Sequence, residues 1–238
     1  SALRDHNMSG RASIFFVILA AWCLGVSLPA AAGGGADLVR ALTAAAPNLD
    51  RTVLRRAVSA MNCALDRGLE RAERLAIIDF SLPSSEQRLW IFDLSRRELL
   101  LNELVAHGQG SGQNLASQFS NVSGSHQSSI GLFRTSESYR GRHGYSLRMD
   151  GLEAGINDLA RERAIVIHGA DYVDPQWIDR QGRIGRSQGC PAVRPEVAST
   201  VVDTLKDGQF LFSWYPDPDW LANSDFLNCQ AGTLARLD

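Results

Sequence analysis

Lysine is almost absent from this 238-residue sequence: of its 24 basic residues, only Lys206 is a lysine. An excess of positive charge is absent too, because 26 acidic residues oppose the 24 basic ones. A nucleic-acid-binding domain carries a clustered basic surface, so we expect no nucleic-acid partner. No internal repeat is visible. The 45% hydrophobic and 21% charged residues are ordinary for a globular protein with a core.

Residues 1–32 have the pattern of a secretory signal peptide. Arg4 and Arg11 precede an apolar run over residues 12–28, and the small residues of Ala30-x-Ala32 form a cleavage pattern. A retained membrane anchor is the alternative, but the run is shorter than the roughly 20 residues of a spanning helix. We expect export to the periplasm or cell envelope, with membrane contact only during transit.

Cysteine is also scarce. Three of the four cysteines follow the signal segment: Cys63, Cys190 and Cys229. In an oxidising compartment an odd number leaves one thiol unpaired. A disulfide between Cys63 and Cys229 would leave Cys190 free, whereas in the alternative all three are reduced and buried. Spacing alone does not decide between them.

The apolar pattern predicts an α+β or mainly β fold, with helices around a β-rich core. After a glycine-rich linker at 33–36, three- and four-residue spacing predicts two helices within 37–76. Further helices are predicted at about 154–163 and at 195–206. Polar segment 108–129 lacks periodicity and is predicted to be an ordered, functional surface loop. Strands are predicted at residues 75–80, 88–93, 99–107, 130–135, 145–149, 164–168 and 210–215.

The segment GRSQGCPAV, residues 185–193, contains two candidate nucleophiles, Ser187 and Cys190. Its G-x-S-x-G pattern matches the nucleophile elbow of serine hydrolases. That elbow needs a preceding strand and a later histidine, whereas residues 180–183 are turn-like and the last histidine, His168, lies upstream. Cys190 is therefore the stronger candidate.

The neighbours of Cys190 favour a directed thiol. Gly189 can adopt backbone angles closed to other residues, and Pro191 favours an extended conformation at the cysteine. Because proline has no N–H, an oxyanion hole would use the amides of Cys190 and Gly189, with Gln188 as a further candidate. A buried structural cysteine is the alternative.

A thiol nucleophile needs a base, and His168 is the best placed. The apolar strand 164–167 ends in His168-Gly169, where glycine permits close approach. A satisfied core histidine is the alternative. His143, in a glycine-rich segment, is a second candidate, either lining the cleft or acting as the base. Four aromatic residues are candidate walls of a peptide groove, with core packing as the alternative: Tyr172, Trp177, Trp214 and Tyr215.

Arg186 and Arg194 lie near Cys190 in the sequence and would favour its thiolate. A zinc site made of His168, Asp171 and Cys190 fits no defensible ligand spacing. We therefore expect neither a metal nor a cofactor.

Taken together, Ile167-His168-Gly169 and Ser187-x-Gly189-Cys190 resemble the signature of the L,D-transpeptidase catalytic domain of the YkuD type, specifically its murein L,D-transpeptidase-like branch. The resemblance covers roughly residues 75–216 and implies a β-sandwich-like catalytic domain. This leaves 33–74 as a linker and helical segment and 217–238 as a C-terminal tail. Further matching segments are Phe119-Ser-Asn121, Ser128-Ser-x-Gly131, Gly141-x-His-Gly144, Ser146-Leu-Arg148, Asp150-Gly-Leu-Glu153 and Asn157-Asp158.

The resemblance implies a cysteine acyl-enzyme that acts on peptidoglycan stem peptides. Cys190 would attack the carbonyl that follows the L-centre of diaminopimelate, expel D-alanine and pass the acyl group to a second stem as a 3-3 crosslink. His168 would take the thiol proton and later activate the acceptor amine. The Gly189 and Cys190 amides would hold the oxyanion, Ser187 would fix the turn, and a backbone carbonyl would orient the histidine.

Two positions depart from the family pattern. Gln188 stands where a histidine is common, and Arg194 lies four residues after Cys190 instead of two. Arg186 is therefore an equal candidate for holding a substrate carboxylate. The remaining candidate substrate contacts are His143, Gln188 and Gly169. Two alternative functions are an L,D-carboxypeptidase, which gives the same acyl group to water, and a non-catalytic cell-wall-binding protein.

Overall fold

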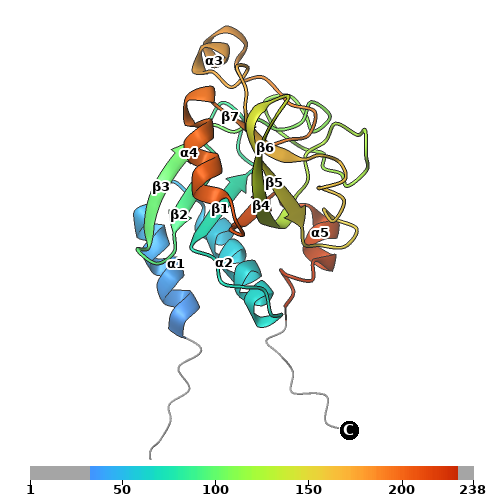
Figure 1. Cartoon of the computed structure of the whole chain (residues 1–238). Coiled ribbons are helices and arrows are strands. Elements are labelled where there is room, and N and C mark those ends of the chain that lie inside the picture. Colours follow the sequence, from blue (N-terminus) through green and yellow to red (C-terminus); the bar gives the residue numbers. More distant parts are fainter. Residues whose placement is uncertain (1–32, 230–238) are drawn as a thin grey trace, which may run out of the picture. The chain divides into compact units, whose positions relative to one another are not determined.

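One eight-stranded sheet organises residues 33–229, the part of the chain that this computed structural model describes (Figure 1). The strand order is β3-β2-β1-β8-β4-β5-β6-β7. The pairs β1–β8 and β6–β7 are parallel, and the other neighbours are antiparallel. The predicted mainly β, α+β class is confirmed. The strands are β1 (Arg74–Asp79), β2 (Leu89–Asp93), β3 (Glu98–Glu103), β4 (Gly131–Gly141), β5 (Gly144–Gly151), β6 (Val166–Gly169), β7 (Ala192–Val193) and β8 (Phe210–Trp214).

Helices cover both faces of this sheet. Along β1, Leu75 and Ile77 pack with the first two helices, whereas Ala76 and Ile78 pack with α4. Both faces of the strand are therefore buried, which explains its uninterrupted apolar sequence. The helices of the described chain are α1 (Gly33–Ala45), α2 (Arg51–Asp66), α3 (Pro175–Gln181), α4 (Pro195–Leu205) and α5 (Pro218–Asn223).

The two N-terminal helices pack closely and belong to the same compact unit as the sheet. Asp50 caps α2 by accepting hydrogen bonds from the amides of Thr52 and Val53, at 2.6 and 3.1 Å. The linker predicted at 33–36 is wrong, because α1 already begins at Gly33. A Cβ on Gly35 would lie 3.1 Å from Asn62 Nδ2 of α2, so this glycine allows the two helices to approach.

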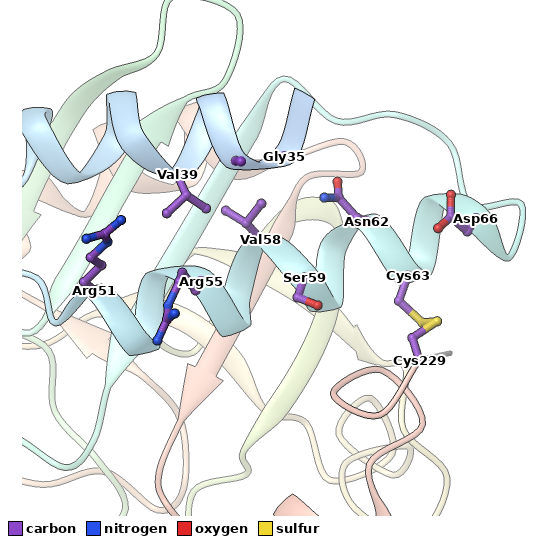
Figure 2. Close-up of a pocket in the computed structure, with 11 residues that line it drawn as sticks. Gly35, Val39, Arg51, Arg55, Val58, Ser59, Asn62, Cys63, Asp66 and Cys229 are labelled. Atoms are coloured by element: carbon purple, nitrogen blue, oxygen red, sulfur yellow. A yellow bond between two sulfur atoms is a disulfide. The ribbon is translucent and has the colours of Figure 1, made fainter. Parts of the chain in front are cut away.

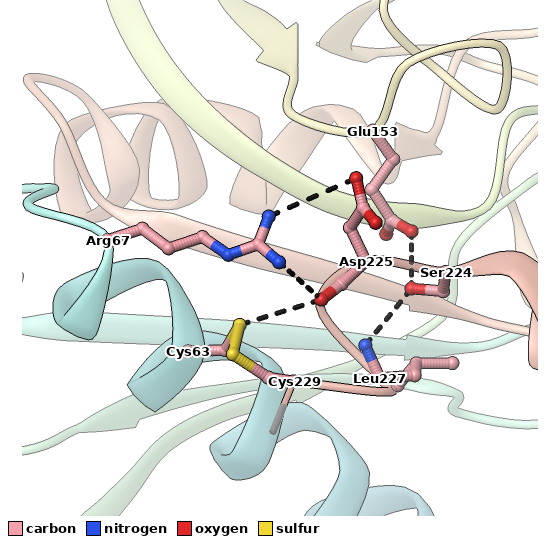
Figure 3. The surroundings of a disulfide bond; sticks show 7 residues. All are labelled: Cys63, Arg67, Glu153, Ser224, Asp225, Leu227 and Cys229. Carbon is pink, nitrogen blue, oxygen red and sulfur yellow. Dashed lines mark hydrogen bonds and ion pairs between the residues drawn. A yellow bond between two sulfur atoms is a disulfide. The ribbon is translucent and has the colours of Figure 1, made fainter. Parts of the chain in front are cut away.

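A disulfide joins Cys63 of α2 to Cys229, as one of the two sequence alternatives predicted (Figure 3). Nearby, the buried carboxylate of Glu153 accepts hydrogen bonds from Trp220 Nε1 at 2.9 Å and from Ser224 Oγ at 2.6 Å. These contacts fasten the segment after β8 to the sheet. Up to Cys229, this segment is part of the packed unit and not a free tail.

The helix predicted at 154–163 is wrong. These residues form successive turns, in which Gly155 has a φ of +75°. The Asn157 side chain donates to the carbonyls of Ile130 and Leu132, at 2.9 and 3.1 Å, and so ties the turns to β4. Asn157 Oδ1 also accepts from the Glu153 amide at 2.9 Å, a local side chain–backbone hydrogen bond of the kind that competes with helix formation.

All seven predicted strands are present, although their ends differ. β3 stops at Glu103 instead of reaching residue 107, and β4 continues to Gly141 instead of ending at 135. Segment 108–129 contains neither a helix nor a named strand, as predicted. The signal peptide predicted for residues 1–32 lies outside the described chain. Within residues 33–229, every helix is too short or too polar to cross a bilayer.

Candidate active site

Cys190 lies in a tight loop before β7, and Ser187 holds that loop in shape. Ser187 Oγ donates to the Cys190 carbonyl at 2.6 Å and accepts from the Gly189 amide at 3.0 Å. Gly189 has a φ of +123°, and a Cβ there would lie 2.9 Å from the Gln127 carbonyl oxygen. Glycine is therefore required at this position.

This geometry changes the expected oxyanion hole. We expected the amides of both Gly189 and Cys190 to face an oxyanion, but the Gly189 N–H is already bonded to Ser187. The Cys190 N–H donates to no other group within residues 33–229. Within the described chain, the amides of Cys190 and Gln188 are therefore the main-chain donors of residues 188–190 that remain available.

The backbone of residues 107–109 is hydrogen-bonded to the loop that carries Cys190. The Ser187 amide donates to the His107 carbonyl at 3.0 Å, and the Gln109 amide donates to the Ser187 carbonyl at 2.8 Å. His107 is fully buried and accepts a hydrogen bond on Nδ1 from Arg88 Nη2, at 2.7 Å. Burial, together with the positive charge of Arg88, lowers the pKa of His107 to about 3. His107 is therefore a neutral structural residue.

His168 stands near the end of β6, where it pairs in register with Ala192 of β7. Its Nδ1 lies 2.9 Å from the Gly169 carbonyl oxygen, and because a carbonyl only accepts, Nδ1 carries the proton. Nε2 is left as the basic nitrogen. The Gly169 carbonyl thus occupies the role of the orienting group, which the sequence could not locate.

Cys190 and His168 line the same cavity, of about 230 Å³. The sulfur receives the Val166 N–H at 3.5 Å and donates to the Ala164 carbonyl at 3.6 Å. Within the described chain no hydrogen bond joins the sulfur to the imidazole. The parallel register places His168 opposite Ala192, two residues beyond Cys190, so His168 approaches the cavity from β6 and Cys190 approaches it from the loop just before β7.

Burial favours the neutral forms of both groups. It raises the pKa of the Cys190 thiol, while the Val166 N–H and the charge of Arg163 act in the opposite direction. Burial lowers the pKa of His168, the Gly169 carbonyl raises it, and the neighbouring His143 lowers it. The resting pair is therefore a thiol and a neutral imidazole.

The cavity wall carries positive but no acidic side chains. Arg186 Nη1 donates to the carbonyls of Gln109 and Gly112, at 3.2 and 2.7 Å. Arg142, on the turn between β4 and β5, has no hydrogen-bond or ion-pair partner within residues 33–229. This wall suits an anionic ligand group. The residues that line it are Gln109, Arg142, His143, His168, Tyr172, Arg186, Ser187, Gln188 and Cys190.

Of three further candidates from the sequence, His143 and Gln188 lie at the cavity and Arg194 does not. His143 stacks on His168, with ring centroids 4.5 Å apart and the planes 27° from parallel. Arg194 Nε lies 3.0 Å from Glu103 Oε2, and its Nη2 bonds the second carboxylate oxygen. Its charge is therefore compensated inside the fold.

Sequence reasoning missed Arg142 and the supporting pair Arg88–His107. In the sequence, Arg142 has the pattern of an ordinary solvated arginine on a turn. Only its place next to the candidate residue His143 indicates that it lines the cavity. No group of three or more metal-ligating side chains occurs within residues 33–229, and the His168–Asp171–Cys190 set is not assembled.

A larger cavity, of about 410 Å³, lies between α1 and α2 beside the disulfide (Figure 2). Arg51, Arg55 and Asn62 line it together with apolar residues of both helices. It contains none of the candidate catalytic residues. The site is therefore assigned by its chemistry and not by cavity size.

A family model described as the L,D-transpeptidase catalytic domain matches residues 45–214. The chain belongs to this family. The match begins in α1, ahead of residue 75, where the sequence resemblance began. None of the curated proteins compared with the chain matches it.

Solved L,D-transpeptidases are similar to the chain at low identity. The L,D-transpeptidase from Mycobacterium smegmatis is 15% identical, with a TM-score of 0.38, over 60% of this chain and 59% of that one. The L,D-transpeptidase from Stackebrandtia nassauensis is 12% identical, with a TM-score of 0.36, over 76% and 77% of the two chains. The chain thus spans less than two thirds of the first structure, and the family assignment rests on the sequence match.

Proposed function

We propose that this protein is an exported cysteine acyltransferase that joins peptidoglycan stem peptides through 3-3 crosslinks. The observation that carries the proposal is the shared cavity of Cys190 and His168, with the imidazole oriented by the Gly169 carbonyl. Membership of the L,D-transpeptidase family supports the same reaction class. The Cys63–Cys229 disulfide supports export, because disulfides persist mainly in oxidising compartments.

The first half-reaction forms a thioester. The Cys190 side chain turns from the backbone of residues 164–166 toward the imidazole, and His168 Nε2 takes the thiol proton as sulfur attacks the donor carbonyl. The oxyanion receives the Cys190 N–H, a contribution of about 3 kcal/mol for one preorganised donor. Collapse breaks the amide bond, and the imidazolium gives its proton to the departing D-alanine amine.

The second half-reaction regenerates the enzyme. The amine of a second stem peptide attacks the thioester carbonyl while His168 removes a proton from it. The thiolate leaves and is protonated by the imidazolium. The new amide bond is the crosslink, so bonds and protons balance over the cycle.

The arginine side chains that line the cavity, Arg142 and Arg186, would orient the donor stem peptide. A tetrapeptide ends in a carboxylate next to the scissile bond, and Arg142 has no competing partner in the described chain. Arg186 is fixed by two carbonyls and adds charge to the same cavity. Arg142 is therefore our principal candidate for the carboxylate contact, with His143 and Gln188 as neighbours on the wall.

The function is tested by incubating the purified protein with a disaccharide-tetrapeptide and weighing the products. Crosslinked dimer with release of D-alanine is the expected result, and Cys190→Ser is the matched control. Tripeptide monomer alone would identify an L,D-carboxypeptidase instead. Absence of both products, with retained binding to cell wall, would identify a non-catalytic protein.

A further inference from the structure

Arg163 is a charged residue for which the mechanism above has no role. Its guanidinium spans the polar loop 108–129: Nη1 bonds the Ser120 carbonyl and Ser129 Oγ, and Nη2 bonds Ser125 Oγ at 3.3 Å and the Gln127 carbonyl at 2.7 Å. All four acceptors are neutral. No carboxylate of residues 33–229 pairs with this guanidinium, and its Nε is buried without a partner.

Arg163 is connected to the nucleophile loop through two neighbouring carbonyls. The residue that follows it, Ala164, supplies the carbonyl that accepts from Cys190 Sγ at 3.6 Å. The Gln127 carbonyl, which receives Nη2, would be 2.9 Å from a Cβ on Gly189. Arg163 is thus linked to the Cys190 sulfur through Ala164 and to Gly189 through the Gln127 carbonyl.

The backbone at Ala164 reinforces this arrangement. Ala164 has a φ of +54°, in the left-handed region that L-residues seldom adopt. Its amide donates to the Arg161 carbonyl at 3.0 Å, which closes the turn in this conformation. Strained backbone of this kind is common next to functional groups. Here the Ala164 carbonyl accepts from the sulfur, and Arg163 lies three residues before β6, the strand that carries His168.

We propose that Arg163 is a positioning residue whose uncompensated charge stabilises the thiolate of Cys190, while its hydrogen bonds hold loop 108–129 behind the nucleophile. The proposal rests on the assignment of Cys190 as the nucleophile. Burial lowers the pKa of Arg163, whereas the cysteine raises it, as expected when a guanidinium and a thiolate attract each other. An anion formed at Cys190 supplies the counter-charge that the loop lacks.

Other charged or titratable groups face the sulfur and must be separated from this effect. His168 lies on β6, and Tyr172 lies beyond its end. Arg142 and His143 face the cavity from the β4–β5 turn, and Arg186 faces it from the nucleophile loop. The test therefore changes Arg163 alone and reads the acidity of the thiol directly.

The experiment measures iodoacetamide alkylation of Cys190 against pH in the full chain, with peptide mass spectrometry so that Cys23 does not contribute. The midpoint is the pH at which the alkylation rate reaches half of its maximum. In Arg163→Gln this midpoint should rise by about one pH unit, so that alkylation at a fixed pH below the midpoint becomes about tenfold slower. Arg161→Gln is the matched control, because Arg161 lies two residues away on the surface and pairs with Asp150 and Glu137. Its midpoint should be unchanged.

Two more variants separate charge from loop structure. Arg163→Lys keeps the charge but not the forked hydrogen bonds, so its Tm should fall while its midpoint stays within a few tenths of a unit of the parent. Ser125→Ala with Ser129→Ala removes two loop contacts and should leave the midpoint in place.

A parental midpoint in Arg163→Gln would overturn the proposal. A full-unit rise in Arg163→Lys or in the double serine variant would overturn it as well, even if Arg163→Gln does not fold. Alkylation reports thiol acidity alone. Failure here would therefore leave the crosslinking assay unaffected, and failure of that assay would not alter the alkylation profile.

Discussion

The Nδ1 of His168 donates to the Gly169 carbonyl at 2.9 Å, so the side chain is oriented by its own neighbour in the chain. This contact fixes the tautomer and leaves Nε2 as the proton acceptor. The ring is buried at the end of β6, and the imidazole of His143 covers one side of it. In the proposed mechanism His168 is therefore the base, and the neighbouring His143 lowers its pKa.

His168→Ala should slow labelling of Cys190 by a carbapenem at neutral pH by about 100-fold or more, in the range expected for loss of a general base. The labelled fraction is read by intact mass against time. His126→Ala is the control, because His126 lies outside the cavity. Equally slow labelling of the parent and of His168→Ala would favour the non-catalytic alternative.

His143→Phe keeps a stacked ring but removes the ring nitrogens. Because His143 lowers the pKa of His168, the variant should raise that pKa. Nε2 must be neutral to accept a proton, so the acidic limb of kcat/KM against pH should move to higher pH. A limb that stays in place would show that His143 does not tune the base.

Arg142→Gln should raise the KM for a tetrapeptide donor about tenfold, which corresponds to loss of about 1.5 kcal/mol for one charge-assisted hydrogen bond. The KM for the same donor with a C-terminal amide should change little. Arg140→Gln is a matched control on the same hairpin, because Arg140 lies over the Tyr145 ring instead of in the cavity. Equal effects on the acid and the amide would exclude a carboxylate contact.

Cys63→Ser should lower the free energy of unfolding by about 2–5 kcal/mol, because the disulfide closes a long loop in the unfolded chain. The bonded residues are 166 positions apart. Urea unfolding measures the change, and Cys190→Ser should leave the stability within about 0.5 kcal/mol of the parent. Unchanged stability in Cys63→Ser would mean that the C-terminal segment is held by its other contacts, such as Glu153 with Trp220.

Seven of the eight strands were predicted from the sequence, with β7 missed, and the predicted partners Cys190 and His168 line one cavity. Apolar runs such as residues 75–78 predict buried strands because both faces of the sheet are covered. The glycine beside Cys190 was predicted to direct the thiol, and Gly189 has a φ of +123° that favours glycine. The short helices α3 and α5 were missed, although Asp174-Pro175 and Asp217-Pro218 are ordinary start signals.

The polar contacts of the site were not predictable, because they depend on residues far apart in the chain. Arg194 was a candidate for substrate until its carboxylate partner, Glu103, was found on β3. The Gly189 amide was expected to bind the oxyanion, but in the structure it donates to Ser187 Oγ. Arg163 was not a candidate from the sequence, because only the fold brings it against loop 108–129.

The central claim is that Cys190 carries the acyl group, and the intact mass of the protein during turnover tests it most directly. After rapid mixing with a disaccharide-tetrapeptide and acid quench, the account predicts an adduct equal to the donor minus D-alanine, located on Cys190 and consumed when acceptor is added. Turnover that persists in Cys190→Ser, or crosslinking with no adduct on that sulfur, would contradict it.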